Sequence, residues 1–292
     1  AFRFSVGSES IAVRVATVPT VFGERIVLRL LRGGVPRTLL ELGWDRGEIE
    51  LLEDALDPAE GAVIMCGPTG SGKTSSLYGI LRMLVGRGMS VMSAEDPVEA
   101  LVPGVAQSEV RSERGVGFSE LLRAFLRSDP DAIMVGETRD AQSARLAVQA
   151  ATTGHLVLTS LHCADAAGCR ARLGVLGVEN DELREVVRLI VSQRLLPMIC
   201  QNCSAPDLTG SNELKSALFR GAGCELCGAT GRRGRVPIVE LVTWAPERRN
   251  GASSFPYETL WSFSDSVRRR LSSGSVSLED ARAWLVPGRQ PP

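Results

Sequence analysis

The sequence is poor in the features that mark membrane proteins and nucleic-acid-binding proteins. None of its apolar runs approaches the ~18 residues that a membrane-spanning helix needs, and its first residues do not form a signal-peptide pattern. Aromatic residues make up 5% of the 292 residues, and the formal net charge is −1. A chain with few stacking rings and no basic field is a poor candidate for a nucleic-acid-binding protein. Because it begins at Ala1 rather than Met, we expect a fragment or a processed product.

The strongest local signal is the stretch GAVIMCGPTGSGKT at residues 61–74, in a chain with 44% hydrophobic residues and enough length for about two domains. Its apolar run predicts a buried strand over 62–66. Apolar residues at helical spacing then predict a helix that stops at Gly86 and Gly88. Between the two lies the pattern G-x4-G-K-T, in which backbone N–H groups and a helix dipole favour a phosphate group.

This placement predicts ATP binding. We expect Lys73, on an exposed loop, to reach the β- and γ-phosphates, and the hydroxyl of Thr74 to ligate Mg²⁺. The residues expected to bind the nucleotide are Gly67, Pro68, Thr69, Gly70, Ser71, Gly72, Lys73, Thr74 and Ser75. An ordinary glycine-rich turn is the alternative, and the predicted strand and helix on either side argue against it.

Two further apolar runs end in acidic residues. The predicted strand over 90–94 is followed by EDPVE at 95–99, and the one over 131–136 is followed by Glu137. The carboxyl ends of parallel strands border the nucleotide crevice of α/β sheets. Glu137 is therefore the candidate for orienting or deprotonating the attacking water, with Glu99 assisting. Which of the two is the dominant base stays open.

Four of the seven cysteines form two C-x2-C pairs that are separated by 20 residues. Such pairs predict one zinc held by four thiolates, in a reducing compartment. The expected zinc ligands are Cys200, Cys203, Cys224 and Cys227. The other three cysteines have no such pairing and are expected to be buried small residues: Cys66, Cys163 and Cys169.

The rest of the chain carries weaker signals. Alternating runs within 2–31 predict the last strands of a small α+β domain, followed by a linker at 33–36. A strand over 155–160 lies between the only two histidines, His155 and His162. We expect helices over 39–56, 119–128, 140–153, 164–174, 180–196, 264–272 and 277–285, and a strand over 235–240.

Taken in order, these pieces resemble the secretion ATPases that power type II secretion and type IV pilus assembly. The tetracysteine module is similar to that of the secretion and pilus-extension branches of this family. The other segments that carry the resemblance are the arginine-bearing RVATVPTVFGE at 14–24 with Arg29, the Asp box EDPVE at 95–99, the Walker B segment DPDAIMVGETRD at 129–140, the His box TGHLVLTSLH at 153–162, and QRL at 193–195. Cys163 and Ala164 stand where Thr and Asn are usual in the family.

The resemblance implies an α/β fold with a RecA-like P-loop ATPase core, a homo-hexamer with nucleotide sites at subunit interfaces, and ATP, Mg and Zn as cofactors. Arg14 and Arg29 would face the phosphates. Arg123 and Arg127 would form a further pair near the site, and His162 would join the catalytic residues. The resemblance also implies a cytoplasmic motor, peripheral at the inner membrane, whose partners are an inner-membrane platform and cytoplasmic docking proteins.

The expected domains are the end of a small α+β domain with its linker at 1–36, the ATPase core at 37–198, the zinc module at 199–235 and a C-terminal helical segment at 236–292. Two other functions stay open at this point. One is a RecA-like nucleic-acid motor, which would need a basic track or stacking aromatics. The other is an ATP-regulated scaffold without turnover. The sequence does not distinguish the secretion branch from the pilus branch.

Overall fold

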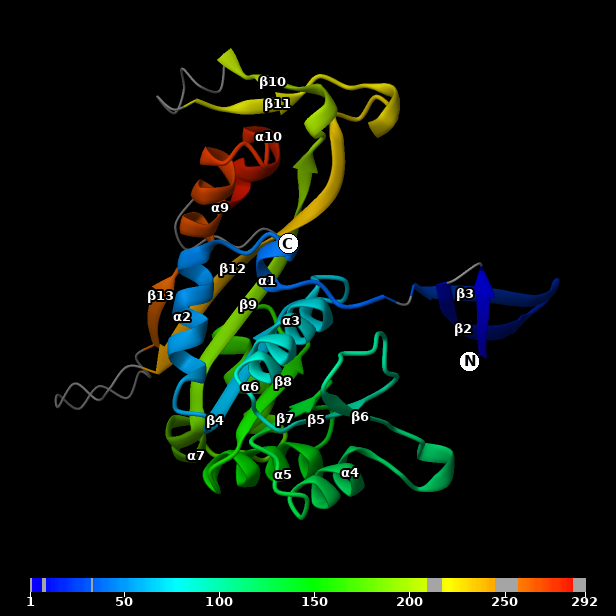
Figure 1. Ribbon diagram of the computed structural model, residues 1–292, viewed down its shortest axis with the longest axis vertical. Helices are drawn as coiled ribbons and strands as arrows, with labels where there is room; N and C mark the ends of the chain where they lie inside the picture. The colour runs from blue at the N-terminus through cyan, green and yellow to red at the C-terminus, as the bar shows by residue number, and fades with distance from the viewer. Residues whose placement is uncertain (1, 7–8, 33, 209–216, 245–256, 286–292) are drawn as a thin grey trace.

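The computed structural model describes residues 2–6, 9–32, 34–208, 217–244 and 257–285 (Figure 1). Its first part is a three-stranded antiparallel sheet in the order β1-β2-β3, with bounds Phe2–Val6, Glu9–Thr20 and Gly23–Arg32. Strands were expected here, and the register of β2 on β3 places Arg14 opposite Arg29. Figure 1 shows this small sheet extending away from the layered core.

The centre of the molecule is an eight-stranded sheet in the order β13-β12-β9-β4-β8-β7-β5-β6. The strands from β9 to β6 are parallel, and β12 and β13 are antiparallel at one edge. The parallel strands span Gly61–Cys66 (β4), Val91–Glu95 (β5), Val105–Glu109 (β6), Ala132–Val135 (β7), Leu156–Leu161 (β8) and Val187–Ile199 (β9). Because the central ones are buried on both faces, they form continuous apolar runs, and the expected α/β fold is confirmed.

Helices cover both faces of this sheet, and on each face their apolar side chains pack against the strands to form one buried cluster. On one face α4 to α7 pack against the strands, and on the other face α1 to α3 do so. The helices span Leu39–Leu42 (α1), Arg46–Leu56 (α2), Lys73–Gly86 (α3), Phe118–Phe125 (α4), Ala141–Thr152 (α5), Ala166–Val175 (α6) and Asn180–Val186 (α7), with a 3-10 turn at Ser112–Arg114. None of the described helices is both long and apolar enough to cross a membrane.

The predicted helix over 180–196 is wrong beyond its first two turns. After α7 the chain enters β9, which lies between β4 and β12. Its residues Leu189, Ile190 and Val191 are all buried, because Ile190 packs into the apolar cluster on one face of the sheet and Leu189 and Val191 pack into the cluster on the other. A continuous apolar run of this kind suits a buried strand as well as a buried helix, so periodicity alone could not separate the two.

The predicted helix over 39–56 is interrupted. Gly43 ends α1 with a φ of 93°, and Asp45 caps α2 by accepting a hydrogen bond from the N–H of Gly47 at 3.0 Å. The break directs Trp44 into the core, where its side chain is 2% exposed. A glycine is tolerated within helical patterns, so the apolar spacing did not reveal that this one is a C-cap.

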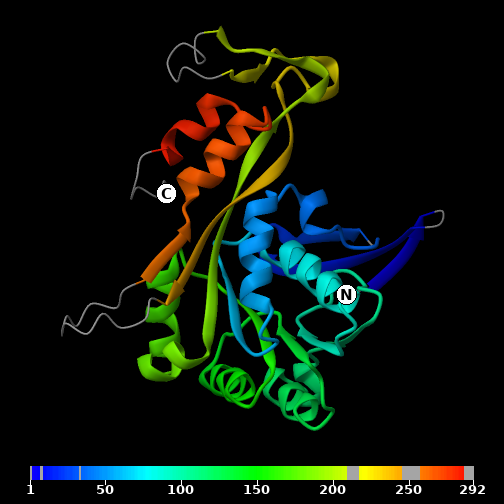
Figure 2. The same ribbon diagram turned by 60° about the vertical axis from the view of Figure 1, so that its left-hand side comes forward.

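The long strands β9 and β12 continue beyond the sheet as an antiparallel ribbon that carries the cysteine pairs at its far end (Figure 2). Strand β12 spans Arg232–Trp244 and includes the expected strand, and β13 (Tyr257–Trp261) was not expected.

The last two predicted helices are confirmed. They are α9 (Phe263–Ser272) and the pair of short turns α10 (Leu278–Ala281) and Arg282–Trp284. They pack on the ribbon through a third apolar cluster. Short strands Ser204–Pro206 (β10) and Phe219–Gly221 (β11) pair at its tip, between 3-10 turns at Gln201–Cys203 and Glu225–Cys227.

Candidate functional site

The phosphate-loop segment folds as the sequence predicts. It leaves β4 at Cys66 and enters α3 at Lys73, so strand, loop and helix follow one another. Gly67 and Gly72 have φ values of 151° and 88°. A Cβ at Gly67 would lie 2.6 Å from the carbonyl oxygen of Gln193, and one at Gly72 would lie 2.8 Å from its side-chain nitrogen. Only glycine therefore lets the loop pack this closely against β9.

The expectation that Lys73 lies on an exposed loop is wrong, because Lys73 is the first residue of α3 and is 7% exposed. Its Nζ donates to the carbonyl oxygens of Gly67 at 2.7 Å and Pro68 at 3.1 Å, and burial lowers its pKa. Ser71 Oγ, also buried in the loop, has no hydrogen-bond partner among the described residues. A phosphate group would offer an acceptor to both side chains, so this loop fits a nucleotide.

A cavity of about 520 Å³ lies where the parallel strands end. Its lining from the phosphate loop consists of Thr69, Gly70, Ser71, Gly72, Lys73, Thr74 and Ser75. Its lining from the segments at the carboxyl ends of β5, β7 and β8 includes Glu95, Asp96, Glu99, Glu137, Arg139, Ser160 and His162. The structure therefore brings the predicted Glu99, Glu137 and His162 together with the phosphate loop. The remaining loop residues, Gly67 and Pro68, hold Lys73 through their carbonyl groups.

Glu137 is held through both of its carboxylate oxygens. Arg139 Nε and Nη2 each lie 2.7 Å from Glu137 Oε2, and His162 Nε2 lies 3.2 Å from Oε1. Arg139 Nη1 also lies 3.4 Å from Asp96 Oδ2, and the hydrogen bond to Glu137 raises the pKa of the guanidinium. Arg139 was missed as a site residue, although it lies in the Walker B segment. Its position two residues after an acid does not show where its long side chain points.

The neighbouring Glu95 has a structural role. It is 2% exposed and accepts hydrogen bonds from Ser93 Oγ at 2.6 Å and from the hydroxyl of Tyr78. The same hydroxyl accepts from the backbone N–H of Glu99 at 3.0 Å, and burial raises the pKa of Tyr78. The Tyr78 hydroxyl thus joins Glu95 to the turn that presents Glu99 to the cavity.

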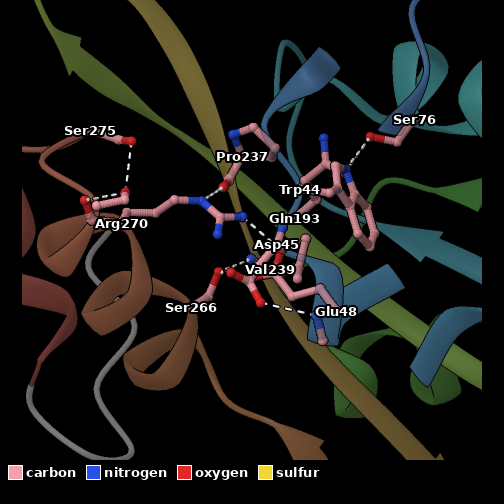
Figure 3. A network of polar contacts seen from close by, with 12 residues as sticks. Trp44, Asp45, Glu48, Ser76, Gln193, Pro237, Val239, Ser266, Arg270 and Ser275 are labelled. Carbon is pink, nitrogen blue, oxygen red and sulfur yellow. Dashed lines mark hydrogen bonds and ion pairs between the residues drawn. The ribbon is translucent and has the colours of Figure 1, made fainter. Parts of the chain in front are cut away.

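A chain of polar contacts connects Trp44, Ser76 and Gln193, which Figure 3 labels, to the phosphate loop. Gln193 Nε2 donates to the carbonyl oxygen of Ser71 at 2.7 Å, and Gln193 Oε1 accepts from Ser76 Oγ at 2.8 Å. Trp44 Nε1 in turn donates to Ser76 Oγ at 3.1 Å. All three side chains are buried, so the contacts are shielded from water and fix the position of the loop on β9. The sequence pointed to Gln193 only because the QRL segment resembles that of the secretion ATPases. Nothing in the sequence predicted that Trp44 belongs to this network.

Two of the predicted arginines are described through their backbone. Arg14 and Arg29 are partners in the β2–β3 register, and Leu30, which follows Arg29, lines the cavity. Strand β3 therefore passes the mouth of the candidate site.

The other two predicted arginines, Arg123 and Arg127, do not line the cavity that the described residues form. Arg123 is exposed on α4, with Nη1 3.4 Å from Glu120 Oε1, and Arg127 follows the end of that helix. His155 lies at the opposite end of β8 from His162, with Nδ1 3.2 Å from the carbonyl oxygen of Ala150. It is thus far along the strand from the acidic groups and packs against the end of α5.

The four paired cysteines converge as the sequence predicts. The Sγ atoms of Cys200 and Cys224 are 3.9 Å apart, those of Cys203 and Cys227 are 3.9 Å apart, and those of Cys224 and Cys227 are 3.7 Å apart. Four thiolates around one zinc at about 2.3 Å are separated by roughly 3.8 Å in a tetrahedron. The N–H of Cys224 donates to Cys227 Sγ at 3.2 Å and lowers the pKa of that thiol to about 6. The cluster therefore fits a zinc ion.

The sequence matches a known protein family and several of its members. The family profile described as "Type II/IV secretion system protein" matches residues 1–262. The type IV pilus assembly ATPase PilB of Thermus thermophilus is 38% identical over 261 residues, which are 85% of this chain and 29% of that protein. The type II secretion system protein E of Aeromonas hydrophila is 35% identical over 294 residues, which are 94% of this chain and 59% of that protein.

Solved structures share the fold. The chain covers 77% of a crystal structure of the pilus retraction motor PilT with bound ADP, with a TM-score of 0.65, 25% identity and 98% of this chain aligned. It covers 75% of the Legionella pneumophila ATPase DotB, with a TM-score of 0.69, 23% identity and 96% of this chain aligned. The chain is thus similar to most of each solved structure, but it spans only 29% and 59% of the two sequence relatives.

Proposed function

The chain belongs to the type II/IV secretion system protein family, and from this premise we propose that it is the ATP-hydrolysing part of a motor for type II secretion or type IV pilus assembly. The observation that carries the proposal is the position of Glu137, whose carboxylate lines the same cavity as Lys73 and Thr74. The names of the relatives, PilB ATPase and secretion system protein E, support the same function.

In this proposal the side chains divide the work of phosphoryl transfer. Lys73 would leave the loop carbonyl groups and bind the β- and γ-phosphates of ATP, and the hydroxyl of Thr74 would ligate Mg²⁺. The metal ion neutralises phosphate charge when bound. Glu137, held by Arg139 and His162, would orient or deprotonate the attacking water, with Glu99 assisting.

Phosphate release tests this proposal. The chain should release phosphate from ATP in the presence of Mg²⁺. Lys73→Ala should lose phosphate release, and in a nucleotide titration it should bind more weakly by about 1.5–3 kcal/mol, or roughly 10- to 150-fold, because charge-assisted hydrogen bonds are lost. Arg172→Ala removes a positive charge from the exposed side of α6 and serves as the matched control. Because Lys73 is buried, the fold of its variant is checked by circular dichroism. Equal phosphate release by the parent and Lys73→Ala would rule out this loop as the hydrolytic site.

We propose further that the nucleotide sites lie between the subunits of a homo-hexamer and that Arg14 and Arg29 act there. Strand β3 passes the mouth of the cavity at Leu30, which supports a role for arginines of this hairpin. Arginines that meet developing charge lower the barrier more than they improve ground-state binding. Arg14→Ala should therefore lose turnover more than nucleotide affinity. Mixing it with Lys73→Ala should restore part of the activity, and mixed rings without restoration would contradict action across an interface.

For the tetracysteine cluster we propose one structural zinc ion, with all four ligands supplied by the chain. The spacing of the sulfurs supports this, together with N–H groups that donate to them. Protein purified without added zinc should contain about one equivalent. The double variant Cys224→Ser, Cys227→Ser should lose it, whereas Cys169→Ala removes a thiol outside the cluster and should retain it. Full zinc content in the double variant would contradict the site.

The proposed location is the cytoplasm, peripheral at the inner membrane, with an inner-membrane platform and cytoplasmic docking proteins as partners. Arg123 and Arg127 remain proposed as a second arginine pair, which would reach a site only in an assembled ring.

The RecA-like nucleic-acid motor is the competing proposal, and titration with single-stranded and double-stranded DNA separates it from the secretion motor. A scaffold without turnover would release no phosphate.

A further inference from the structure

The three cysteines that were expected to be unrelated buried residues form a second cluster. Cys66 ends β4 directly before the phosphate loop, Cys163 follows His162, and Cys169 lies in α6. Cys66 and Cys169 are fully buried as expected, and Cys163 is half-buried. All three Sγ atoms lie within 4.8 Å of one another, and those of Cys66 and Cys163 are 3.0 Å apart. Three chain segments thus bring their thiols to one point behind the candidate active site.

The sulfur spacing distinguishes this cluster from the zinc-like one. In the tetracysteine cluster, the sulfurs of Cys200 and Cys224, of Cys203 and Cys227, and of Cys224 and Cys227 are 3.7–3.9 Å apart, as thiolates around a common zinc ion require. Cys66 and Cys163 are closer than two thiolates on one tetrahedral zinc, which are roughly 3.8 Å apart. A further approach of about 1 Å would bring them to the ~2.05 Å of a sulfur–sulfur bond. The geometry of this pair therefore suits a disulfide rather than metal coordination.

We propose that Cys66 and Cys163 form a reversible disulfide when the protein meets hydrogen peroxide, and that this bond slows ATP turnover. Cys163 is the sulfur that reacts first, because it is half-buried whereas its two neighbours are fully buried. Hydrogen bonding with the thiols of Cys169 and Cys66 also lowers the pKa of Cys163, which favours the reactive thiolate.

The oxidation of the two cysteines to a disulfide takes two steps. The Cys163 thiolate attacks peroxide, so that a sulfur–oxygen bond forms, the oxygen–oxygen bond breaks and hydroxide leaves to take up a proton as water. The Cys66 sulfur then attacks Cys163, so that the disulfide forms, the sulfur–oxygen bond breaks, and the departing hydroxide takes the proton of Cys66. Together the two sulfurs lose two electrons, peroxide gains them, and two waters result.

The effect on turnover follows from the neighbours of the two cysteines, and it rests on the proposed ATPase function. Cys66 is the last residue of the central strand β4, and it pairs with Leu161 of β8. Its position is therefore fixed by the sheet. Cys163 lies in the segment after β8, so it is the side that moves to close the remaining distance. His162 precedes it and contacts Glu137 at 3.2 Å. The disulfide should therefore shift His162 away from Glu137 and slow hydrolysis more than it weakens nucleotide binding.

Peptide mapping under non-reducing conditions tests the bond. The full chain is treated with hydrogen peroxide, alkylated and digested, and a linked peptide that joins Cys66 to the segment containing Cys163 is expected. Cleavage by trypsin after Arg170 leaves Cys163 and Cys169 in one peptide, so variants assign the partner. The link should persist in Cys169→Ala and disappear in Cys163→Ala. A link that disappears in Cys169→Ala, or a second equivalent of metal that is lost in Cys163→Ala, would overturn the proposed pair.

Turnover before and after oxidation tests the consequence. The parent and Cys169→Ala should lose most of their phosphate release on oxidation and regain it with dithiothreitol, whereas Cys163→Ala should respond much less. Each variant is compared with its own reduced sample, so oxidation of the zinc-site cysteines is shared by all three. A fully linked parent that hydrolyses ATP as fast as its reduced form would contradict the effect on turnover. Absence of hydrolysis in the reduced parent would instead contradict the proposed function, and the peptide map would still decide the bond.

Discussion

Glu137→Gln is expected to bind ATP and Mg²⁺ nearly as well as the parent but to hydrolyse ATP roughly 10²–10⁴ times more slowly, the usual contribution of a general base. The amide has the same size as the carboxylate and can still meet the water shell of the metal ion. It loses the negative charge and the proton affinity that polarise the attacking water. It also weakens the contacts to Arg139 and His162, which hold the carboxylate at present. Single-turnover hydrolysis and nucleotide titration of the same preparation separate the chemical step from binding.

Glu99→Gln is the matched control, because Glu99 lines the same cavity and carries the same charge. It should slow the chemical step less than Glu137→Gln does. Arg139→Ala adds a second comparison, since it removes a partner of Glu137 without touching the carboxylate. It should retain part of the activity. If Glu99→Gln stalls hydrolysis and Glu137→Gln does not, the roles of the two carboxylates are reversed.

The parts of the site that a single short segment encodes could be predicted from the sequence. The phosphate loop needs glycines at fixed spacing between a strand and a helix, so the order of residues specifies its shape directly. Glu137 and Glu99 could be placed for a similar reason. Each follows a buried strand, and parallel strands bring their carboxyl ends to one edge of the sheet.

Contacts between distant segments could not be predicted in this way. Gln193 supports the phosphate loop from a strand that begins more than a hundred residues later, and that strand was predicted as a helix. Cys66 and Cys163 are likewise 97 residues apart, and their 3.0 Å contact depends on β4 lying beside β8. Neither cysteine belongs to a local motif. Pairings of this kind are set by the order of strands in the sheet, which composition and periodicity do not report.

The position of Lys73 shows a second limit. The motif led us to expect Lys73 on an exposed loop, but its ammonium lies against the carbonyl groups of Gly67 and Pro68. The burial of that ammonium depends on the close packing of Gly67 and Gly72 against β9. The sequence motif specifies which residues form the loop, and the tertiary packing decides how far it is buried.

The buried ion pair between Glu48 and Arg270 provides the second large expected effect, on stability rather than catalysis. Glu48 is 0% exposed on α2, and Arg270 is 4% exposed on α9. Their closest atoms, Glu48 Oε2 and Arg270 Nη2, are 2.6 Å apart (Figure 3). Ser266 Oγ donates to the other carboxylate oxygen at 2.5 Å, and Arg270 Nε donates to the carbonyl oxygen of Pro237 at 3.1 Å. The pair thus joins α9 to α2, and the bond to Pro237 joins α9 to β12.

Arg270→Met should destabilise the chain by about 3–5 kcal/mol, because it leaves the Glu48 carboxylate buried without its counter-charge. The double variant Glu48→Met, Arg270→Met should recover much of this loss, since two apolar side chains avoid the desolvation of either charge. The matched control is Arg232→Met, which removes a pair of similar geometry, 2.9 Å from Asp280, but from a side chain that is 41% exposed. A pair that is accessible to water contributes about 0–1 kcal/mol. Urea unfolding followed by circular dichroism gives the free energy of unfolding of all three variants. A loss in Arg270→Met no larger than that in Arg232→Met would show that the buried pair does not hold α9 against α2.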